Sequence, residues 1–236
     1  MIPYHILALP GLLLLAACAA APGGTASPRG TATSYSSMTV IEAIEVCAKG
    51  DDAARQAAAI RTIETEVLRL SGKQHLDRPM LKVLADCHMR FGDYGGAAQR
   101  YGEILEAVDR RGEPQGTHYA DALQGQARAY EGLQRYEEAG LRYQQALAIK
   151  ERVLGSQHPE IASLLTDLGR TFYRTGKYQE AEEAFSGALS ILEGAYSKDD
   201  ARLAPVLENM LRLYVAQGRP EEAAEVRARV SAIRGG

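Results

Sequence analysis

The sequence predicts an all-α protein, built as a right-handed α-solenoid of stacked antiparallel helix pairs. Tyr94, Tyr136, Tyr178 and Pro220 lie at equal intervals of 42 residues. Around each of them, apolar residues recur at three- and four-residue spacing, which is the period of an amphipathic helix. Small residues such as Ala181 recur at fixed offsets and let paired helices pack closely. A single pair cannot bury its apolar face alone, so we expect neighbouring pairs to stack.

Residues 1–17 are interpreted as a lipoprotein signal peptide. They form an apolar run that is short for a membrane span and contains His5 but neither Lys nor Arg. Leu15-Ala16-Ala17-Cys18 resembles the bacterial lipobox, which implies acylation of Cys18 and anchoring in the lipid bilayer. Because Ala19 is not Asp, the resemblance implies the outer membrane, facing the periplasm. The alternative is an ordinary signal peptide that contains a stray cysteine.

Residues 18–37 are expected to form the lipidated Cys18 and a flexible tether. This stretch is rich in Ala, Gly, Pro, Ser and Thr and has almost no large apolar residue. A flexible chain of ~20 residues spans about 25 Å, so the folded part would lie at that distance from the bilayer. Acyl chains on Cys18 would hold it there, since two or more chains anchor stably.

Residues 38–78 are predicted to form a degenerate N-terminal helix pair. The apolar series that includes Val40, Ile44 and Cys47 stops at residues 50–52, and a helical period resumes at Ala54. The offsets of this pair fit the later repeats poorly. Cys47 and Cys87 fall on predicted neighbouring helices. They can form a disulfide in an oxidising compartment, or each can be a small buried apolar residue.

Residues 79–236 are predicted to contain four repeats of about 42 residues. Leu165, Leu168-Gly169, Phe172, Ala181 and Phe185 resemble the tetratricopeptide pattern. The longer interval, and the linker Leu154-Gly155 followed by His158-Pro159, resemble the kinesin light chain class of these repeats. Pro220 and Arg227 stand where the earlier copies have a tyrosine and an aromatic residue. A polar outer face on the last repeat is typical of capping.

The resemblance implies that the first helix of each pair lines a concave groove that binds a partner. Arg128, Arg170 and Arg212 occupy one register of these helices, and Arg forks suit carboxylates, so an acidic peptide or protein is the expected ligand. The alternative is a solvated face whose arginines pair with Glu131, Glu208 or Asp86. The candidate groove residues are Lys82, Asp86, Arg90, Gln124, Arg128, Glu131, Thr166, Arg170, Tyr173, Arg174, Glu208 and Arg212.

No catalytic, cofactor-binding or metal-binding residues are expected. The sequence has no Gly-x-Ser-x-Gly elbow, phosphate loop or His-Glu-x-x-His helix. His158, before Pro159, is interpreted as a turn residue. A net charge of −3 argues against a nucleic-acid partner.

The sequence therefore predicts a non-enzymatic protein-interaction scaffold that assembles or positions a complex of the bacterial cell envelope. Three alternatives remain open. The first is a periplasmic protein that binds a small ligand or glycan, although Tyr173 is almost the only aromatic residue expected in the groove. The second is a regulator of a cell-wall hydrolase. The third is an unrecognised hydrolase, which the lack of a convergent nucleophile and base disfavours.

Overall fold

The computed structural model describes residues 38–49, 53–71, 78–109 and 116–235. Within these ranges the regular structure is helical and no strand occurs, which confirms the all-α prediction. In the same ranges no helix is both long and apolar enough to cross a membrane. The expected signal peptide, Cys18 and the tether lie outside the described residues.

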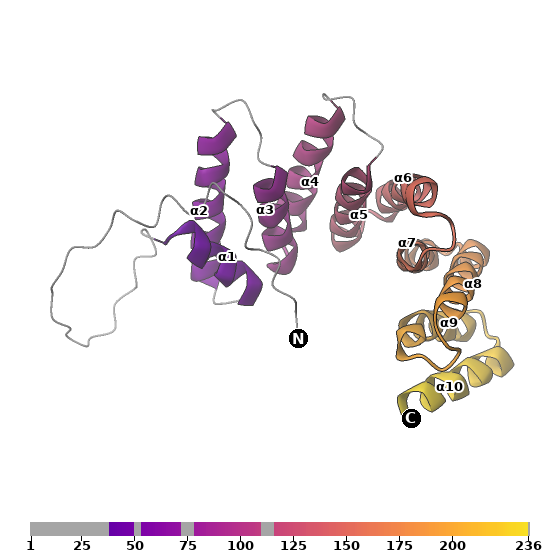
Figure 1. The fold of residues 1–236 in the computed structure, drawn as a ribbon. Helices are drawn as coiled ribbons and strands as arrows, with labels where there is room; N and C mark the ends of the chain where they lie inside the picture. The colour runs from indigo at the N-terminus through magenta and orange to yellow at the C-terminus, as the bar shows by residue number, and fades with distance from the viewer. Residues whose placement is uncertain (1–37, 50–52, 72–77, 110–115, 236) are drawn as a thin grey trace, which may run out of the picture. The chain divides into compact units, whose positions relative to one another are not determined.

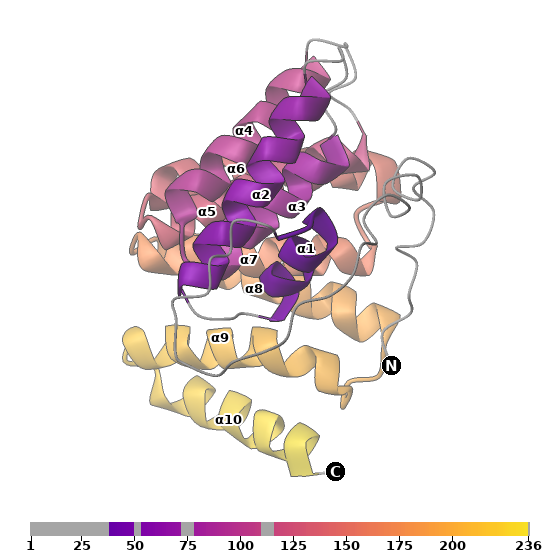
Figure 2. The same ribbon diagram turned by 90° about the vertical axis from the view of Figure 1, so that its left-hand side faces the viewer.

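The α-helices follow one another as antiparallel pairs, each contacting the next (Figures 1 and 2). The bounds are α1 (Val40–Lys49), α2 (Ala53–Ser71), α3 (Arg78–Arg90), α4 (Tyr94–Asp109), α5 (Thr117–Gly132), α6 (Tyr136–Leu154), α7 (Pro159–Arg174), α8 (Tyr178–Ala195), α9 (Ala204–Ala216) and α10 (Pro220–Gly235). A 3-10 turn, η1 (Ala201–Leu203), precedes α9. We call α3/α4, α5/α6, α7/α8 and α9/α10 the first to fourth repeats.

The turn inside each repeat has the same geometry. In every copy, the backbone N–H of the last turn residue donates to a carbonyl five residues earlier; Lys177 N donates to Phe172 O at 2.9 Å. This bond closes the C-terminus of the first helix and requires a left-handed residue. Gly92, Gly176 and Gly218 supply it at positive φ, whereas the second repeat uses Gln134 at φ 60°.

In the middle repeats, the core has a large side chain on the second helix and a small residue on the first. Phe185 on α8 is fully buried and lies against Gly169 on α7, where an added Cβ would be 2.6 Å from the Phe185 ring. In the second repeat, Tyr143 and Ala127 are both buried. Enlarging the small residue would overpack the pair and typically cost about 1–3 kcal/mol.

The linker between the second and third repeats is fixed by polar contacts. His158 caps α7, because its imidazole Nδ1 accepts a hydrogen bond from the Glu160 N–H at 3.2 Å and Pro159 starts the helix. The buried ammonium of Lys150 on α6 lies 2.7 Å from both Asp121 on α5 and Glu160 on α7. These contacts link α5, α6 and α7 at the linker.

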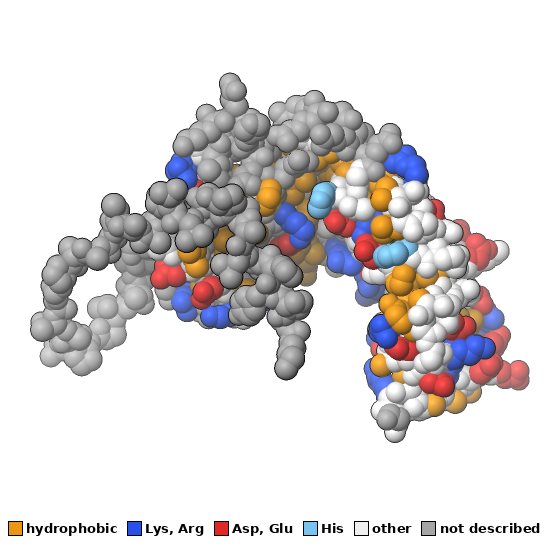
Figure 3. Space-filling view, in the orientation of Figure 1, with side chains coloured by type: hydrophobic (Ala, Val, Ile, Leu, Met, Phe, Trp, Pro, Cys, Tyr) orange, Lys and Arg blue, Asp and Glu red, His pale blue; other side chains and the backbone are white. Residues whose placement is uncertain are grey.

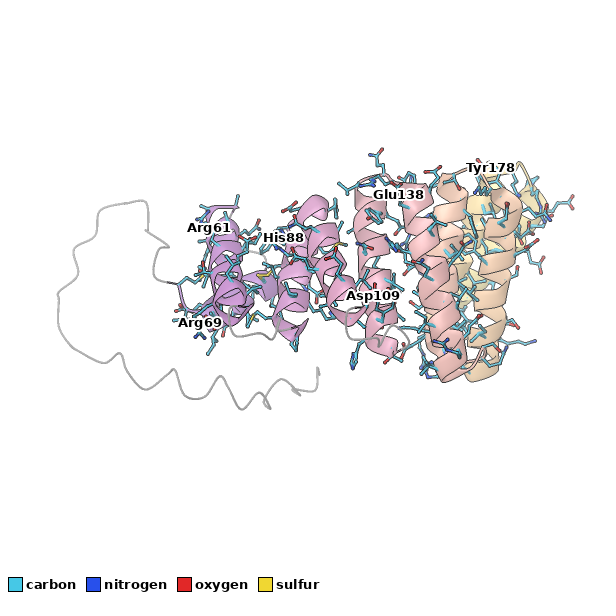
Figure 4. The ribbon with its side chains drawn as sticks, turned by 90° about the horizontal axis from the view of Figure 1, so that it is seen from above. Arg61, Arg69, His88, Asp109, Glu138 and Tyr178 are labelled. Carbon is cyan, nitrogen blue, oxygen red and sulfur yellow. A yellow bond between two sulfur atoms is a disulfide. The ribbon has the colours of Figure 1, made fainter. Side chains whose placement is uncertain are left out.

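Cys47 on α1 and Cys87 on α3 form a disulfide, shown as a yellow bond in Figure 4. Their Cα atoms are 5.1 Å apart, and both residues are buried. Of the two alternatives left open by the sequence, the structure contains the covalent pair. It attaches the N-terminal helix pair to the first repeat across 40 residues of chain.

Candidate protein-interaction surfaces

The twelve residues predicted to line the groove lie on the first helices α3, α5, α7 and α9, and we call this surface the first-helix face. On the face seen in Figure 3, the visible Lys and Arg side chains are interspersed with Asp and Glu rather than forming one large patch. What the face can bind therefore depends on which of its charges are already paired within the chain.

Arg128 on α5 is paired with Asp167 on α7. Its Nη2 lies 2.9 Å from Asp167 Oδ2, and Gln124 Nε2 donates to the same oxygen at 3.1 Å. Only 10% of the Asp167 side chain is exposed, whereas the Arg128 side chain is 48% exposed. The carboxylate thus lies buried between two neighbouring first helices, with the guanidinium above it.

Arg170 on α7 completes this network with Glu131 on α5. Its Nη2 lies 2.8 Å from Glu131 Oε2 and 3.1 Å from Asp167 Oδ1. Thr171 and Tyr143 also donate to Glu131, at 3.1 and 2.9 Å. Burial opposes the charge on Arg170, but the hydrogen bond and the charge of Glu131 outweigh it, so the pKa of Arg170 is raised. Burial, together with the charges of Asp167 and Glu131, raises the pKa of the Tyr143 hydroxyl.

Other members of the face are paired as well. Lys82 lies 2.7 Å from Asp86, which also accepts a hydrogen bond from Tyr101. Glu208 pairs with Arg234 on α10. Arg90 donates to a backbone carbonyl, that of Ala48, at 2.9 Å.

Arg174 and Arg212 differ from these residues. Both are exposed, and neither has a carboxylate partner within the described residues; Arg212 has only a 3.4 Å contact to Asn209. Tyr173 lies beside Arg174 on α7, and its ring centroid is 5.8 Å from that of Tyr178. Within the described residues, the positive charge of the first-helix face that has no carboxylate partner therefore lies on Arg174 and Arg212 of the third and fourth repeats, and on Arg90 of the first repeat, which donates only to a backbone carbonyl.

These contacts bear on the sequence interpretation. Arg170 pairs with Glu131, as the alternative of internal pairing expected. Asp167, Thr171 and Tyr143 also belong to the network, although none of the three was predicted to line the groove. The equivalent positions in the neighbouring repeats hold Gly125 and Asn209, which are uncharged. A charged residue at position 167 was therefore the sequence signal that could have indicated the network.

A second surface lies between the second helix of one repeat and the first helix of the next. A cleft of 520 Å³ separates α4 from α5, and it is lined by Gly95, Ala98, Gln99, Gly102, Glu103, Glu106, Gln126, Tyr130, Leu133 and Arg135. A smaller cleft of 220 Å³ lies between α6 and α7, lined by residues that include Gly140, Phe172 and Lys177. Gly140, Phe172 and Lys177 lie 42 residues after Ala98, Tyr130 and Arg135, so the two clefts occupy the same position in successive repeats.

Across the described ranges, His, Cys, Asp and Glu side chains do not form a group that could hold a metal ion. His88, the buried histidine of α3, has its Nδ1 2.7 Å from Asp93 Oδ2, in the turn of the first repeat. Figure 4 shows its position close to the disulfide.

Comparison with solved structures finds the same fold in other repeat proteins. A variant of a Podosopora anserina putative kinesin light chain, with nearly identical TPR-like repeats, superposes with a TM-score of 0.72 at 20% identity, over 83% of this chain and 94% of that one. BtubC (BKLC) from P. vanneervenii gives 0.64 at 21% identity, over 84% and 87%. A Rap protein complexed with competence and sporulation factor gives 0.62 at 16% identity, over 83% and 54%. These likenesses show the fold, with kinesin light chain-like proteins among the neighbours.

Comparison with curated protein sequences finds no significant match. A family model described as tetratricopeptide repeat matches residues 77–152, 133–193 and 160–234. Because this match covers well over half of the chain, the protein belongs to the tetratricopeptide repeat family, whose members are in general non-enzymatic scaffolds that bind other proteins or peptides.

Proposed function

We propose that this chain is a membrane-anchored scaffold of the bacterial cell envelope, which binds an acidic segment of a partner protein along its first-helix face. Acylation of Cys18 would hold it at the outer membrane, and the repeats would face the periplasm. By binding its partner there, the scaffold would assemble or position an envelope complex.

The observation that carries the binding mode is the contrast among the arginines of the first-helix face. Arg128 and Arg170 are engaged with Asp167 and Glu131, whereas Arg174 and Arg212 have no carboxylate partner within the described residues. A guanidinium binds a carboxylate through two parallel hydrogen bonds, which adds geometric specificity to charge attraction.

The positions of these two arginines suit a single extended ligand. Arg174 lies one helical turn after Arg170 on α7, and Arg212 occupies the register of Arg170 on α9, which contacts α7. Tyr173 and Val215 share a second register of the same helices, and Val215 is exposed. An acidic segment with an apolar residue would contact both kinds of side chain.

The binding proposal is tested by charge reversal. In cells, a photo-cross-linking amino acid placed at Tyr173 should capture a partner, and Arg174→Glu with Arg212→Glu should reduce the yield by tenfold or more. A matched control is Arg152→Glu with Arg227→Glu, two exposed arginines on α6 and α10. It makes the same change in net charge and should leave the yield unchanged. Equal loss in both double variants would show that net charge, rather than this face, governs capture.

The anchoring proposal has its own test. Wild-type protein expressed in bacteria should incorporate labelled palmitate and fractionate with the outer membrane. Cys18→Ala should lose both properties, because the substitution removes the thiol that would be acylated. Unlabelled wild-type protein would contradict the anchor without affecting the binding proposal.

A further inference from the structure

The cleft between α4 and α5 has a repeat equivalent between α8 and α9, and there a carboxylate of the chain itself occupies the corresponding place. Tyr214 OH donates to Glu182 Oε1 at 3.1 Å, and Arg219 Nη1 donates to Glu182 Oε2 at 2.7 Å. The Arg219 guanidinium lies 4.4 Å from the centroid of the Tyr214 ring. The carboxylate is thus bound by a hydroxyl and by a guanidinium that stacks on an aromatic ring.

The same binding groups recur 84 residues earlier. Tyr130 and Arg135 take the places of Tyr214 and Arg219, and the Arg135 guanidinium lies 4.7 Å from the centroid of the Tyr130 ring. Arg135 binds Glu138 through Nε and Nη2, much as Arg219 binds Glu222 through Nε. Among the described residues, the Tyr130 hydroxyl and Arg135 Nη1 have no hydrogen-bond partner.

What the earlier cleft lacks is the carboxylate. Ala98 stands in the position of Glu182, and Gly95 and Gly102, which have no side chain, also line the cleft. Gln126 lines the same cleft and is only 5% exposed. Its Nε2 donates to the Ala98 carbonyl at 3.1 Å, while its buried Oε1 has no partner. The cleft therefore offers unused donors on Tyr130 and Arg135, whereas the unpaired Gln126 oxygen is itself buried.

We propose that the cleft between α4 and α5 binds a Glu or Asp side chain from an acidic segment of a partner protein. The partner's carboxylate would accept hydrogen bonds from Tyr130 OH and Arg135 Nη1, as Glu182 accepts them from Tyr214 and Arg219 inside this chain. This site is separate from the first-helix face, since Tyr130 and Arg135 are not among the residues of that face and the cleft opens between α4 and α5.

Two features favour a protein segment as the occupant. At 520 Å³ the cleft is much larger than a carboxylate, so the residues flanking the acidic side chain would also be enclosed. Leu133 lines the cleft and is 38% exposed, which offers an apolar contact to a neighbouring side chain. Partner residues that bury such apolar area add affinity that an isolated carboxylate cannot.

Two of the acidic residues around the cleft are paired or have a counterpart at the occupied site. Glu103 is paired with Arg100 at 2.9 Å, and Glu138 is the counterpart of Glu222, which lies beside the occupied site. Glu106 lines the cleft as well, so the attraction of Arg135 and the Tyr130 hydroxyl must outweigh its negative charge. The cleft between α6 and α7 provides the contrast within the same molecule. There, Phe172 replaces the tyrosine and lacks its hydroxyl, and Lys177 replaces the arginine and lacks the two-pronged guanidinium. This cleft should therefore bind a carboxylate far more weakly.

Carboxylate binding by the cleft can be tested in the full chain by replacing one of its own residues with glutamate. Ala98→Glu should raise the unfolding temperature relative to Ala98→Gln, which has the same shape but no charge. A difference of about 2–4 °C corresponds to a gain of roughly 1 kcal/mol for a chain of this size. The difference should vanish when Tyr130→Phe and Arg135→Gln are added. An Ala98→Glu variant no more stable than Ala98→Gln would overturn the proposal.

Binding is tested by selecting peptides from a displayed random library on the immobilised full chain. The proposal expects enriched peptides with a fixed Glu or Asp, whose replacement by Gln or Asn weakens binding at least tenfold. Ala98→Glu should weaken them equally, whereas Arg174→Glu with Arg212→Glu should not, which separates this site from the first-helix face. A selection without peptides sensitive to Ala98→Glu overturns the proposal.

Two other occupants have distinct signatures. Free glutamate that displaces the peptides at equal concentration would identify a small-carboxylate site instead. Dimers of the wild-type chain in light scattering that Ala98→Glu dissociates would identify a second copy of this chain. Either result would overturn the assignment to a partner protein.

Discussion

The contact between α5 and α7 and the contact between α7 and α9 use the same repeat positions with opposite chemistry. At the first contact, buried carboxylates lie between two arginines; at the second, the same positions are neutral or apolar. The replacements are Asp167 by Asn209, Glu131 by Tyr173, Thr171 by Leu213, and Tyr143 by Phe185. One repeat architecture therefore accepts either a polar or an apolar connection between its first helices.

The two connections leave different surfaces available. A buried ion pair loses hydration on folding, and Coulomb attraction repays the loss only where every group is hydrogen-bonded. Asp167 and Glu131 meet that condition, since each accepts several hydrogen bonds. The cost is that Arg128 and Arg170 are occupied. Where the contact is apolar, Arg212 has no carboxylate partner in the described part of the chain and stays available for another protein.

The largest expected effect comes from removing the carboxylate at the centre of the polar contact. Asp167→Ala leaves Arg128, Arg170 and Gln124 without one of their acceptors. Breaking a buried pair typically costs about 3–5 kcal/mol. Because both arginines are partly exposed, we expect about 2–3 kcal/mol here. Urea unfolding followed by circular dichroism measures the difference.

The matched variant is Asn209→Ala at the same repeat position of α9. Its side chain has only the 3.4 Å contact to Arg212, so the free energy of unfolding should change by less than about 0.5 kcal/mol. Equal effects of the two substitutions would show that the polar network does not distinguish the two contacts.

The turns offer a second, smaller comparison between repeats. Gln134 adopts a φ of 60° where the third and fourth repeats have Gly176 and Gly218. A side chain in the left-handed region costs about 1–2 kcal/mol, part of which the greater freedom of unfolded glycine offsets. Gln134→Gly should therefore stabilise the protein by about 0.5–1 kcal/mol in thermal or urea unfolding.

Gly176→Ala is the reciprocal variant. It should destabilise the third repeat by a similar amount, because the left-handed residue there would gain a Cβ. If Gln134→Gly is neutral or destabilising, the Gln134 side chain contributes contacts that compensate for its backbone conformation.

The architecture was predictable from the sequence because the same residue types recur at a fixed interval, that between Tyr136 and Tyr178, so one chain shows its own repeat. The pairing of the arginines was not predictable to the same degree. It depends on which residues of neighbouring helices meet, and Asp167 could be matched to Arg128 only once the stagger of α5 and α7 was known. The cleft between α4 and α5 was not predictable from the sequence for another reason. An alanine at position 98 indicates a site only when it is compared with Glu182, whose contacts to Tyr214 and Arg219 are known from the structure.

The turn of the first repeat differs from the later turns in its charge, which makes its stability sensitive to acid. Asp93 stands where the later repeats have Arg135, Lys177 and Arg219. The pKa of Asp93 is lowered chiefly by the Gly96 N–H, which donates to Oδ1 at 3.0 Å, and also by His88, although burial opposes the shift. A carboxyl with a lowered folded pKa stabilises the protein above its unfolded pKa of about 3.9, and this stability is lost as the pH falls through the folded value.

Asp93→Asn tests this contribution, because an amide oxygen can still accept from the Gly96 N–H while the charge is lost. The variant should be less stable than wild type at pH 7, and the difference in urea midpoint should shrink as the pH falls below about 4. A difference that stays constant down to a pH of about 2.5 would mean that the charge of Asp93 does not stabilise the first repeat. The equivalent position of the second repeat holds Arg135, which does not titrate in this range, so the acid-sensitive contribution of this turn position should be confined to the first repeat.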